Sequence, residues 1–214
     1  MGIERFVQKR ERLIETLTRK GEVERSTDPR ERVPAGQHLT QGFPVLDLGF
    51  RPPFDPITWT LRIFGEVERE LLLTWDEFQA LPRVEQVSDF HCVTTWSKLD
   101  VVWGGVKLAN VSAMAKPRPT ATHLIAYCAE DYTTNLRLTE ALGDDVLLAD
   151  ELDGEPLPLP HGGPVRLVVP KLYGWKSAKF LRALEFSAVD KPGFWEVRGY
   201  HNHGDPWREE RFGR

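Results

Sequence analysis

The sequence predicts a single α+β domain built from short strands and a few short helices. Apolar residues make up 41% of the 214 positions, which is enough for one buried core. Short apolar or alternating segments recur along the chain, and turn-forming Gly, Pro and Asp residues separate them. No internal repeat and no low-complexity linker divides the chain, so one domain is the simplest arrangement.

The N-terminal segment has the pattern of an amphipathic helix. Within residues 3–20 the apolar side chains fall on one stripe, and Arg, Lys and Glu occupy the other face. We therefore assign residues 1–25 to an N-terminal amphipathic helix and residues 26–214 to the domain. A helix packed on the domain is the favoured interpretation, and a partner-docking helix is the alternative. Residues 26–58 are rich in Pro and Gly and are expected to be ordered but irregular.

Several segments have the apolar or alternating pattern of β-strands. They are residues 59–64, 84–90, 123–129, 133–138, 146–152, 155–159, 165–169 and 180–189. The second of these leads directly into His91 and Cys92, after which we expect a loop that is polar and then aromatic. Asp153 and Gly154 favour a tight hairpin turn between two of the segments.

Short helices and an aromatic tail complete the expected elements. A capping box from Thr74 to Glu77 begins a helix that Pro82 ends. Residues 108–115 form a second short helix, and residues 192–214 form an aromatic and charged tail. The chain contains seven Trp and eleven Phe, so we also expect a site lined by rings.

Charge and hydropathy exclude several classes of protein. The 28 basic and 32 acidic side chains are interspersed and give a net charge of −4, which disfavours a nucleic-acid-binding protein. No uninterrupted apolar stretch is long enough for a membrane span or a secretory signal, and no twin-arginine pair is present near the start. We therefore expect a cytoplasmic protein without a membrane span.

Cys92 is the first candidate for chemistry because it stands at the end of an expected strand. A free cysteine is most often a small buried hydrophobic residue, which is the alternative interpretation. Zinc is disfavoured, since His91 and Cys92 would point apart on a strand and no C-x-x-C pair is present. A cysteine hydrolase would require His91 or His161 within hydrogen-bond reach of the thiol.

Glycine turns and cations gather between residues 153 and 179. A glycine pair precedes an expected strand that begins at Arg166, and Lys176 and Lys179 follow a second glycine turn. Backbone N–H groups beside Arg and Lys suit an anionic phosphate. The spacings of a P-loop and of a dinucleotide fingerprint are absent. From these residues alone, an anion site and a solvated turn are equally supported.

The tail carries a weak metal signal in His201 and His203, which have one Asp nearby. We favour a loop folded back on the domain over a metal site. His203 or Trp207 can then border the mouth of the functional site.

Taken together and in this order, the segments resemble the molybdopterin-binding domain of the sulfite oxidase family over roughly residues 38–190. The matching pieces are Phe90-His-Cys92 with Trp96-Ser97, Asp131-Tyr-Thr-Thr134, Asp145-Val-Leu-Leu-Ala149, Asp153-Gly-Glu-Pro-Leu-Pro158, Gly162-Gly-Pro-Val-Arg-Leu-Val-Val-Pro170 and Tyr173-Gly-Trp-Lys-Ser-Ala-Lys179. The resemblance implies molybdenum held by one dithiolene pterin, one protein cysteinate and oxo ligands. Soft sulfur ligation suits such a metal.

The resemblance assigns roles by position. It makes Cys92 the ligand to molybdenum and places Tyr132 near the metal oxo group, so these two are the expected catalytic residues. The residues expected to contact the cofactor are Gln41, His91, Cys92, Cys128, His161, Arg166, Lys176, Ser177, Ala178 and Lys179.

The sequence departs from the sulfite-oxidising members at two places. Residues 39–44 lack the Arg of an Arg-Asn-His loop, and Thr94, Thr95 and Trp96 stand where those members carry Arg after the metal cysteine. A doubly charged oxyanion needs positive charge around the metal, so a neutral or smaller substrate is expected. We expect neither the family's C-terminal immunoglobulin-like domain nor its haem domain within this chain.

The sequence thus predicts a molybdenum–molybdopterin oxidoreductase that transfers an oxygen atom to or from a small molecule. A reductase of S-oxides or N-oxides is the alternative within this class. A cofactor-free binding module is a different class, against which Cys92, Arg166 and Lys179 argue. No haem, iron–sulfur or dinucleotide motif is present, so we expect a separate electron-transfer protein that docks around residues 38–56 and 194–207.

Overall fold

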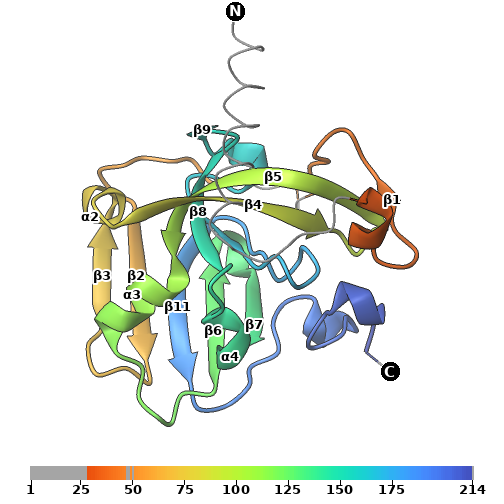
Figure 1. Cartoon of the computed structure of the whole chain (residues 1–214). Coiled ribbons are helices and arrows are strands. Elements are labelled where there is room, and N and C mark those ends of the chain that lie inside the picture. The colour runs from red at the N-terminus through yellow and green to blue at the C-terminus, as the bar shows by residue number, and fades with distance from the viewer. Residues whose placement is uncertain (1–27, 47–48, 50, 214) are drawn as a thin grey trace, which may run out of the picture.

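Two β-sheets pack against each other in the computed structural model, which describes residues 28–46, 49 and 51–213 (Figure 1). The first sheet contains β1 (His38–Leu39), β4 (Arg83–His91), β5 (Trp96–Lys107), β8 (Leu147–Leu152), β9 (Glu155–Pro156) and β10 (Arg166–Val168). The second contains β2 (Thr60–Gly65), β3 (Leu71–Thr74), β6 (His123–Cys128), β7 (Thr133–Arg137) and β11 (Leu181–Ser187). The expected α+β class is confirmed. The helix expected over residues 3–20 lies outside the described residues.

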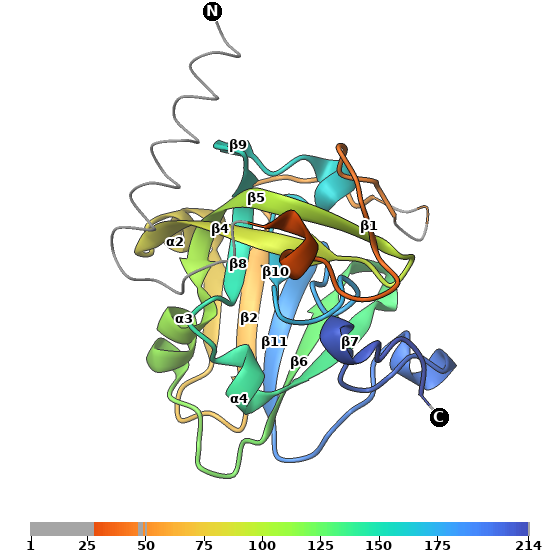
Figure 2. The same cartoon turned by 45° about the vertical axis from the view of Figure 1, so that its right-hand side comes forward.

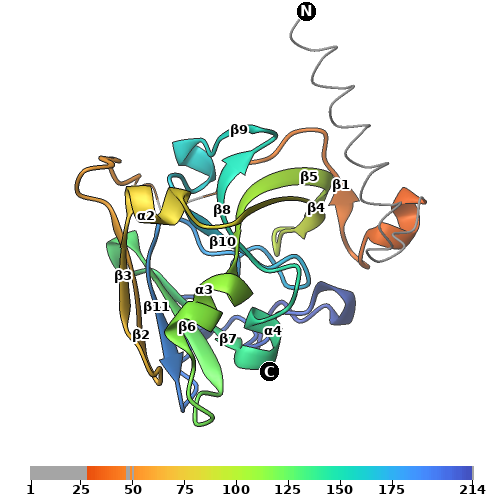
Figure 3. The same cartoon turned by 60° about the vertical axis from the view of Figure 1, so that its left-hand side comes forward.

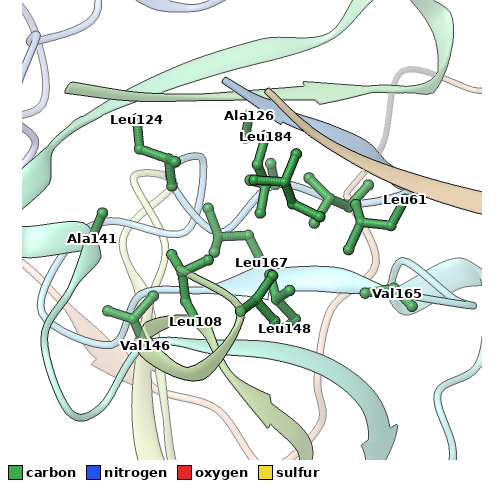
Figure 4. Close-up of a cluster of buried hydrophobic side chains, with 14 of the residues drawn as sticks. Leu61, Leu108, Leu124, Ala126, Ala141, Val146, Leu148, Val165, Leu167 and Leu184 are labelled. Carbon is green, nitrogen blue, oxygen red and sulfur yellow. The ribbon is translucent and has the colours of Figure 1, made fainter. Parts of the chain in front are cut away.

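The hydrophobic core fills the space between the sheets. In Figure 4, Leu61, Leu124 and Leu184 of the second sheet point toward Leu148 and Leu167 of the first. All five side chains are fully buried. Burying a leucine contributes about 1.5–3 kcal/mol, so this layer fixes how the two sheets sit on each other.

The longest strand, β5, is an element that the sequence patterns did not indicate. We expected a loop after Cys92, but the chain turns within residues 92–95 and then runs as a strand of 12 residues. Glycine disfavours strands, and Gly104 and Gly105 hid the pattern. The structure needs them, because a Cβ on Gly105 would lie 2.2 Å from the carbonyl oxygen of Leu148 on β8. Figure 3 shows β4 and β5 arching together across the second sheet.

Local signals in the sequence predicted two of the short helices. In α2 (Trp75–Gln79), Thr74 Oγ1 accepts from Glu77 N at 3.3 Å, and Glu77 Oε2 accepts from Thr74 N at 2.8 Å. This reciprocal pair is the expected capping box. The helix over residues 108–115 is confirmed as α3 (Leu108–Ala115), and α4 (Leu138–Ala141) is a single additional turn.

The expected hairpin is confirmed where β8 pairs antiparallel with β9. Its central residues Asp153 and Gly154 have φ angles of 54° and 79°. Positive φ at both central positions is what a tight hairpin turn requires. No helix among the described residues is long and apolar enough to cross a membrane.

The C-terminal tail is irregular and folds back beside the segment that precedes β1 (Figure 2). Besides short 3₁₀ turns, it contains the two histidines considered as metal ligands. The ring of His203 hydrogen-bonds Glu140 through Nε2 and Glu210 through Nδ1, while His201 Nδ1 lies 3.4 Å from Glu210. Among the described residues no group of three or more side chains could hold a metal ion. Contacts of His203 with Glu140 and of Arg211 with Val93 show that the tail folds back on the domain, as expected.

Candidate functional site

A cavity of about 360 Å³ opens where the end of β4, the segment after β10 and the C-terminal tail meet. Contacts divide much of its lining into two groups of side chains. The first group, called the cationic end, contains Phe43, Phe90, His161, Arg166 and Lys179, which contact one another around Arg166 and Gly162. The second group, called the aromatic end, contains Tyr132, Trp175, Trp195 and Tyr200, which are linked by a hydrogen bond and by ring contacts. Glu130 also lines the cavity and is exposed. Cys92 lies on the wall of the same cavity.

Cys92 follows the last residue of β4, so its side chain leaves the sheet at the cavity wall. Its Sγ atom lies 3.1 Å from Thr94 Oγ1. Burial raises the pKa of the Cys92 thiol, and the hydrogen bond with Thr94 and the charges of Lys179 and Arg211 oppose that rise. Without a bound cation, Cys92 therefore favours the neutral thiol. A metal cation would stabilise the thiolate that ligates it.

Both terminal parts of the described chain hold the loop that carries Cys92. From the N-terminal side, Gln37 donates through Nε2 to the carbonyl oxygen of Cys92 at 3.0 Å. From the C-terminal side, Arg211 donates through Nη1 to the carbonyl oxygen of Val93 at 2.8 Å. Thr95 has φ of 73°, a conformation that a branched residue adopts only when its surroundings enforce it. The loop is thus fixed from outside the sheet.

His91 is buried but does not line the cavity. Its Nδ1 shares a hydrogen bond of 2.8 Å with Ser97 Oγ, and its ring meets Trp207 edge to face. Burial lowers its pKa, so the ring is neutral near pH 7. The thiol of Cys92 has its hydrogen bond with Thr94 and not with a histidine, which leaves a cysteine hydrolase without the general base it needs.

Arg166 carries the strongest sign of an anionic ligand. Its side chain is only 2% exposed, and it donates to the carbonyl oxygens of His161 and Ser177, each at 2.7 Å. Among the described residues no carboxylate lies within ion-pair distance of it. Burial lowers the pKa of Arg166 to about 10. A buried cation without a counter-charge is costly, and an anion in the cavity would remove that cost.

His161 and Lys179 lie beside Arg166 on the same end of the cavity. Burial and the charges of Arg166 and Lys179 lower the pKa of His161, so its ring is neutral. It stacks on Phe43 with ring centroids 4.8 Å apart. Gly162 has φ of 109°, and a Cβ there would lie 2.9 Å from Lys179 Cγ. The glycine turn expected from the sequence therefore lets the two cations pack closely.

Ser177 and Ala178 also line the cavity, as expected. Their positions are fixed by the backbone, because Ser177 Oγ accepts from Val169 N at 2.9 Å and Leu167 N donates to the carbonyl oxygen of Ala178 at 2.9 Å.

Lys176 points away from the cavity, although the sequence placed it among the cofactor contacts. Its Nζ lies 2.6 Å from Glu196 Oε1 and donates to Asn135 Oδ1 at 2.9 Å and to the carbonyl oxygen of Asn202 at 2.7 Å. Lys176 is fully buried. These partners engage its ammonium group, so its visible role is to hold the tail.

The other expected residues divide into those on the cavity and those beside it. Tyr132 lines it, but its hydroxyl donates to the carbonyl oxygen of Trp175 at 2.6 Å. Gln41 is exposed and does not line it, although its neighbours Phe43 and Pro44 do. Cys128 is buried next to the lining residue Ala129 without facing the cavity itself. His203 and Trp207 are also absent from the lining.

Sequence reasoning missed the aromatic residues of the cavity, apart from the general expectation of rings. Phe90, Trp96 and Phe43 stand close to one another at the cationic end, and Arg166 lies 5.4 Å above the Phe90 ring. Trp195 and Tyr200 come from the tail, where the many aromatic residues were the only signal of the site in the sequence. Their position depends on contacts between residues distant in sequence.

Comparison with known proteins decides the family. A family model described as the oxidoreductase molybdopterin binding domain matches residues 49–195. The chain belongs to this family. The match confirms that the protein is an oxidoreductase, and therefore an enzyme, and that its cofactor is molybdenum–molybdopterin. The roles of individual residues stay predictions.

Relatives within the family differ in how much of their length this chain spans. The uncharacterized oxidoreductase YuiH of Bacillus subtilis (strain 168) is 44% identical over 189 residues, which cover 88% of this chain and 96% of that protein. The protein-methionine-sulfoxide reductase catalytic subunit MsrP of Gluconobacter oxydans (strain 621H) is 34% identical over 160 residues, covering 66% of this chain and 51% of the relative. The chain therefore spans nearly all of the first and about half of the second.

A solved structure confirms the fold. The sulfane dehydrogenase SoxCD from Paracoccus pantotrophus superposes with a TM-score of 0.61 at 20% identity, covering 84% of this chain and 58% of that one. At this identity the likeness concerns the fold alone.

The residues present fit a molybdopterin-binding oxidoreductase. The molybdopterin cofactor is anionic, and Arg166 offers it a buried positive charge that no described carboxylate neutralises. Cys92 offers one soft sulfur ligand on the wall of the same cavity. Lys179 and Cys92 line the same cavity, so one ligand can meet both the cationic end and the sulfur.

Proposed function

We propose that this protein uses a molybdenum–molybdopterin cofactor to take an oxygen atom from a small, neutral S-oxide. The observation that carries the proposal is the composition of the cavity, in which Cys92 lines the same space as a cationic group of residues and a neutral aromatic group. The cationic end suits the cofactor, and the aromatic end is left for the substrate. A relative named for the reduction of protein methionine sulfoxide supports the same direction of oxygen transfer.

In this proposal Arg166, Lys179 and His161 hold the anionic and ring portions of the cofactor, and Cys92 supplies its thiolate to the metal. When bound, the molybdenum centre supplies two-electron oxygen-atom transfer. Phe43 stacks on His161 and closes one side of this end of the cavity. The protein therefore orients the cofactor and excludes water around it.

The aromatic end favours a neutral substrate. Tyr132, Trp175, Trp195 and Tyr200 offer uncharged side chains, and the charged residue near them in the lining, Glu130, is acidic and would disfavour an anionic substrate. Reduction of an S-oxide consumes two electrons and two protons, releases one water and leaves the corresponding sulfide. No charge develops on the organic product, so a neutral wall suits both substrate and product.

We further propose that a separate redox protein supplies the electrons. The sequence has no haem-attachment, iron–sulfur or dinucleotide motif, and the described residues contain no second cluster of metal-ligating side chains. Relatives named as catalytic subunits support a divided system. The docking surface around residues 38–56 and 194–207 and the cytoplasmic location stay predictions, which cross-linking and cell fractionation can test.

The test is to produce the protein in a host that makes molybdopterin and to measure molybdenum, which should approach one atom per chain since one thiolate ligand implies one site. Reduced viologen dye should support reduction of dimethyl sulfoxide, whereas oxidation of sulfite with ferricyanide should be slow. Cys92→Ser should remove the sulfur ligand from the X-ray absorption spectrum and abolish turnover. Efficient sulfite oxidation without S-oxide reduction would overturn the proposal, as would an unchanged spectrum in the Ser variant.

A further inference from the structure

The aromatic end of the cavity joins Tyr132 and Trp175 to two residues of the C-terminal tail, Trp195 and Tyr200. The matched family domain ends at residue 195, so Tyr200 lies beyond it. Trp195 and Tyr200 stack with ring centroids 4.8 Å apart and an interplanar angle of 22°. Tyr200 also meets Trp175 edge to face at 5.0 Å. Three rings from two segments thus form one continuous wall, which we call the tail wall (Trp175, Trp195 and Tyr200).

The tail wall presents ring surface to the cavity more than polar groups. Trp175 Nε1 donates to Glu196 Oε1 at 2.9 Å, so its polar atom is engaged inside the protein. The neighbouring hydroxyl of Tyr132 is likewise engaged by the carbonyl oxygen of Trp175. Such a surface binds flat apolar or aryl groups favourably, because the rings stack and apolar surface is removed from water.

Cys92 lies within electrostatic reach of this wall. Cys92, Lys179 and Tyr200 line the same cavity. Burial raises the pKa of Tyr200 and the charge of the Cys92 thiolate raises it further, while the charge of Lys179 opposes the rise in the pKa of Cys92. A ligand beside Cys92 can therefore contact both the cations and the tail wall.

A buried ion pair locks the tail wall in place. Glu196 directly follows Trp195, and Lys176 directly follows Trp175. The pair joins them at 2.6 Å, with side-chain exposures of 1% and 2%. Thr134 Oγ1 donates to the same carboxylate oxygen at 3.0 Å. Since both ions adjoin wall residues, we expect loosening of the pair to shift the rings.

From these contacts we propose that the tail wall is a substrate subsite that binds the aryl or other apolar group on the sulfur atom, and that Lys176 is its positioning residue. The proposal rests on the proposed S-oxide reduction and adds the substrate class: neutral S-oxides with a flat or bulky apolar substituent. It assigns a role in specificity to Trp195 and Tyr200 of the tail.

The experiment compares methyl phenyl sulfoxide with dimethyl sulfoxide as substrates of the molybdenum-loaded enzyme. The readout is the ratio of their kcat/KM values, which cancels differences in cofactor content. Trp195→Ala and Tyr200→Ala should each lower this ratio by about tenfold, because the aryl substrate loses its contact surface. Tyr200→Phe keeps the ring and should keep the ratio. Val197→Ala, a change at an exposed position in the same tail, serves as the control.

Lys176→Met tests the positioning role. It should lower the same ratio, whereas Lys191→Met, which breaks the more exposed pair with Glu185, should not. Should Lys176→Met fail to fold, the ring variants still decide the existence of the subsite. An unchanged ratio in both Trp195→Ala and Tyr200→Ala would overturn it.

Failure of the proposed function gives a different pattern. If the loaded wild-type enzyme reduces no S-oxide, calorimetric binding of methyl phenyl sulfone, a neutral analogue with the same ring, tests the subsite by itself. Binding that weakens about tenfold in Tyr200→Ala but not in Tyr200→Phe would support the tail wall without the reaction. Absent binding, or equal binding by all three proteins, would overturn it.

Discussion

The ammonium group of Lys176 lies 2.6 Å from Oε1 of Glu196, and both side chains are buried. Two cations close together in the sequence, Lys176 and Lys179, therefore have different partners. Lys179 lines the cavity, and Lys176 holds the tail that contributes Trp195 and Tyr200 to the same cavity. The basic segment thus helps to organise both groups of lining residues.

Replacing Lys176 should mainly cost stability. Burial lowers the pKa of Lys176, which the charge of Glu196 opposes, and removing one partner leaves the other charge buried and uncompensated. We expect Lys176→Met to lower the free energy of unfolding by about 3–5 kcal/mol, measured by urea denaturation. The double variant Lys176→Met/Glu196→Gln should recover part of the loss. Full additivity of the two single changes would contradict a direct pair.

Arg166→Ala should purify with less cofactor while still folding. Each charge-assisted contact is worth about 1.5–3 kcal/mol, so cofactor retention should fall roughly tenfold to a hundredfold. Molybdenum and pterin content per chain give the measurement. Arg62→Ala is the matched control. It removes a guanidinium on β2 that pairs with the exposed carboxylate of Glu70. Equal cofactor content in both variants would argue against an anion at Arg166.

Tyr132→Phe should lower turnover and leave the molybdenum content unchanged. The hydroxyl of Tyr132 donates to the carbonyl oxygen of Trp175, so the variant loses a hydrogen bond that holds a residue of the tail wall. It also loses a polar group that we expect to lie near the metal. We expect a destabilisation of about 1 kcal/mol together with a drop in kcat. Tyr127→Phe removes a hydroxyl that bonds Glu185 away from the cavity, and its kcat should stay at the wild-type value. The same kcat in both variants would make Tyr132 purely structural.

The tail should loosen in acid through Asp190. Burial raises the pKa of Asp190, but hydrogen bonds from Asn202 and Asn135, at 2.7 and 2.6 Å, outweigh it and lower the pKa overall. A carboxyl whose pKa is lower in the folded state stabilises the fold above its unfolded pKa of about 3.9, and this contribution is lost as pH falls through the folded value.

The measurement compares wild type with Asp190→Asn. The variant should be about 1 kcal/mol less stable at pH 6, and the difference should shrink below about pH 4 as the wild-type carboxyl is protonated. Asp144→Asn, at an exposed position, is the control. A difference that stays constant from pH 6 to pH 3 would show that the charge of Asp190 is unimportant.

Electron supply should depend on an external donor. Reduced viologen should drive turnover of the purified enzyme, whereas NADH should not, because the chain lacks a dinucleotide fingerprint. The absorption spectrum of the loaded protein should show no haem or flavin bands. Saturable reduction by NADH in highly purified protein would refute the external donor.

The sequence alone determined the features that depend on neighbouring residues. The capping box of Thr74 and Glu77 and the turn at Asp153 and Gly154 appear as expected, because their hydrogen bonds and φ angles are set within a few positions. The ordered series of motifs was also enough to predict the family and its cofactor, and the match over residues 49–195 confirms both. Cys92 at a strand end was likewise visible in the pattern.

Only the tertiary structure decided the strand β5, the partner of Lys176 and the wall formed by Trp195 and Tyr200. The glycines of β5 weaken its local signal, and close packing against β8 requires them. Nothing near Lys176 in the sequence separates a cation that meets a ligand from one that meets Glu196. That choice follows from how the tail folds back, because a buried charge takes whichever opposite charge the packing brings within reach.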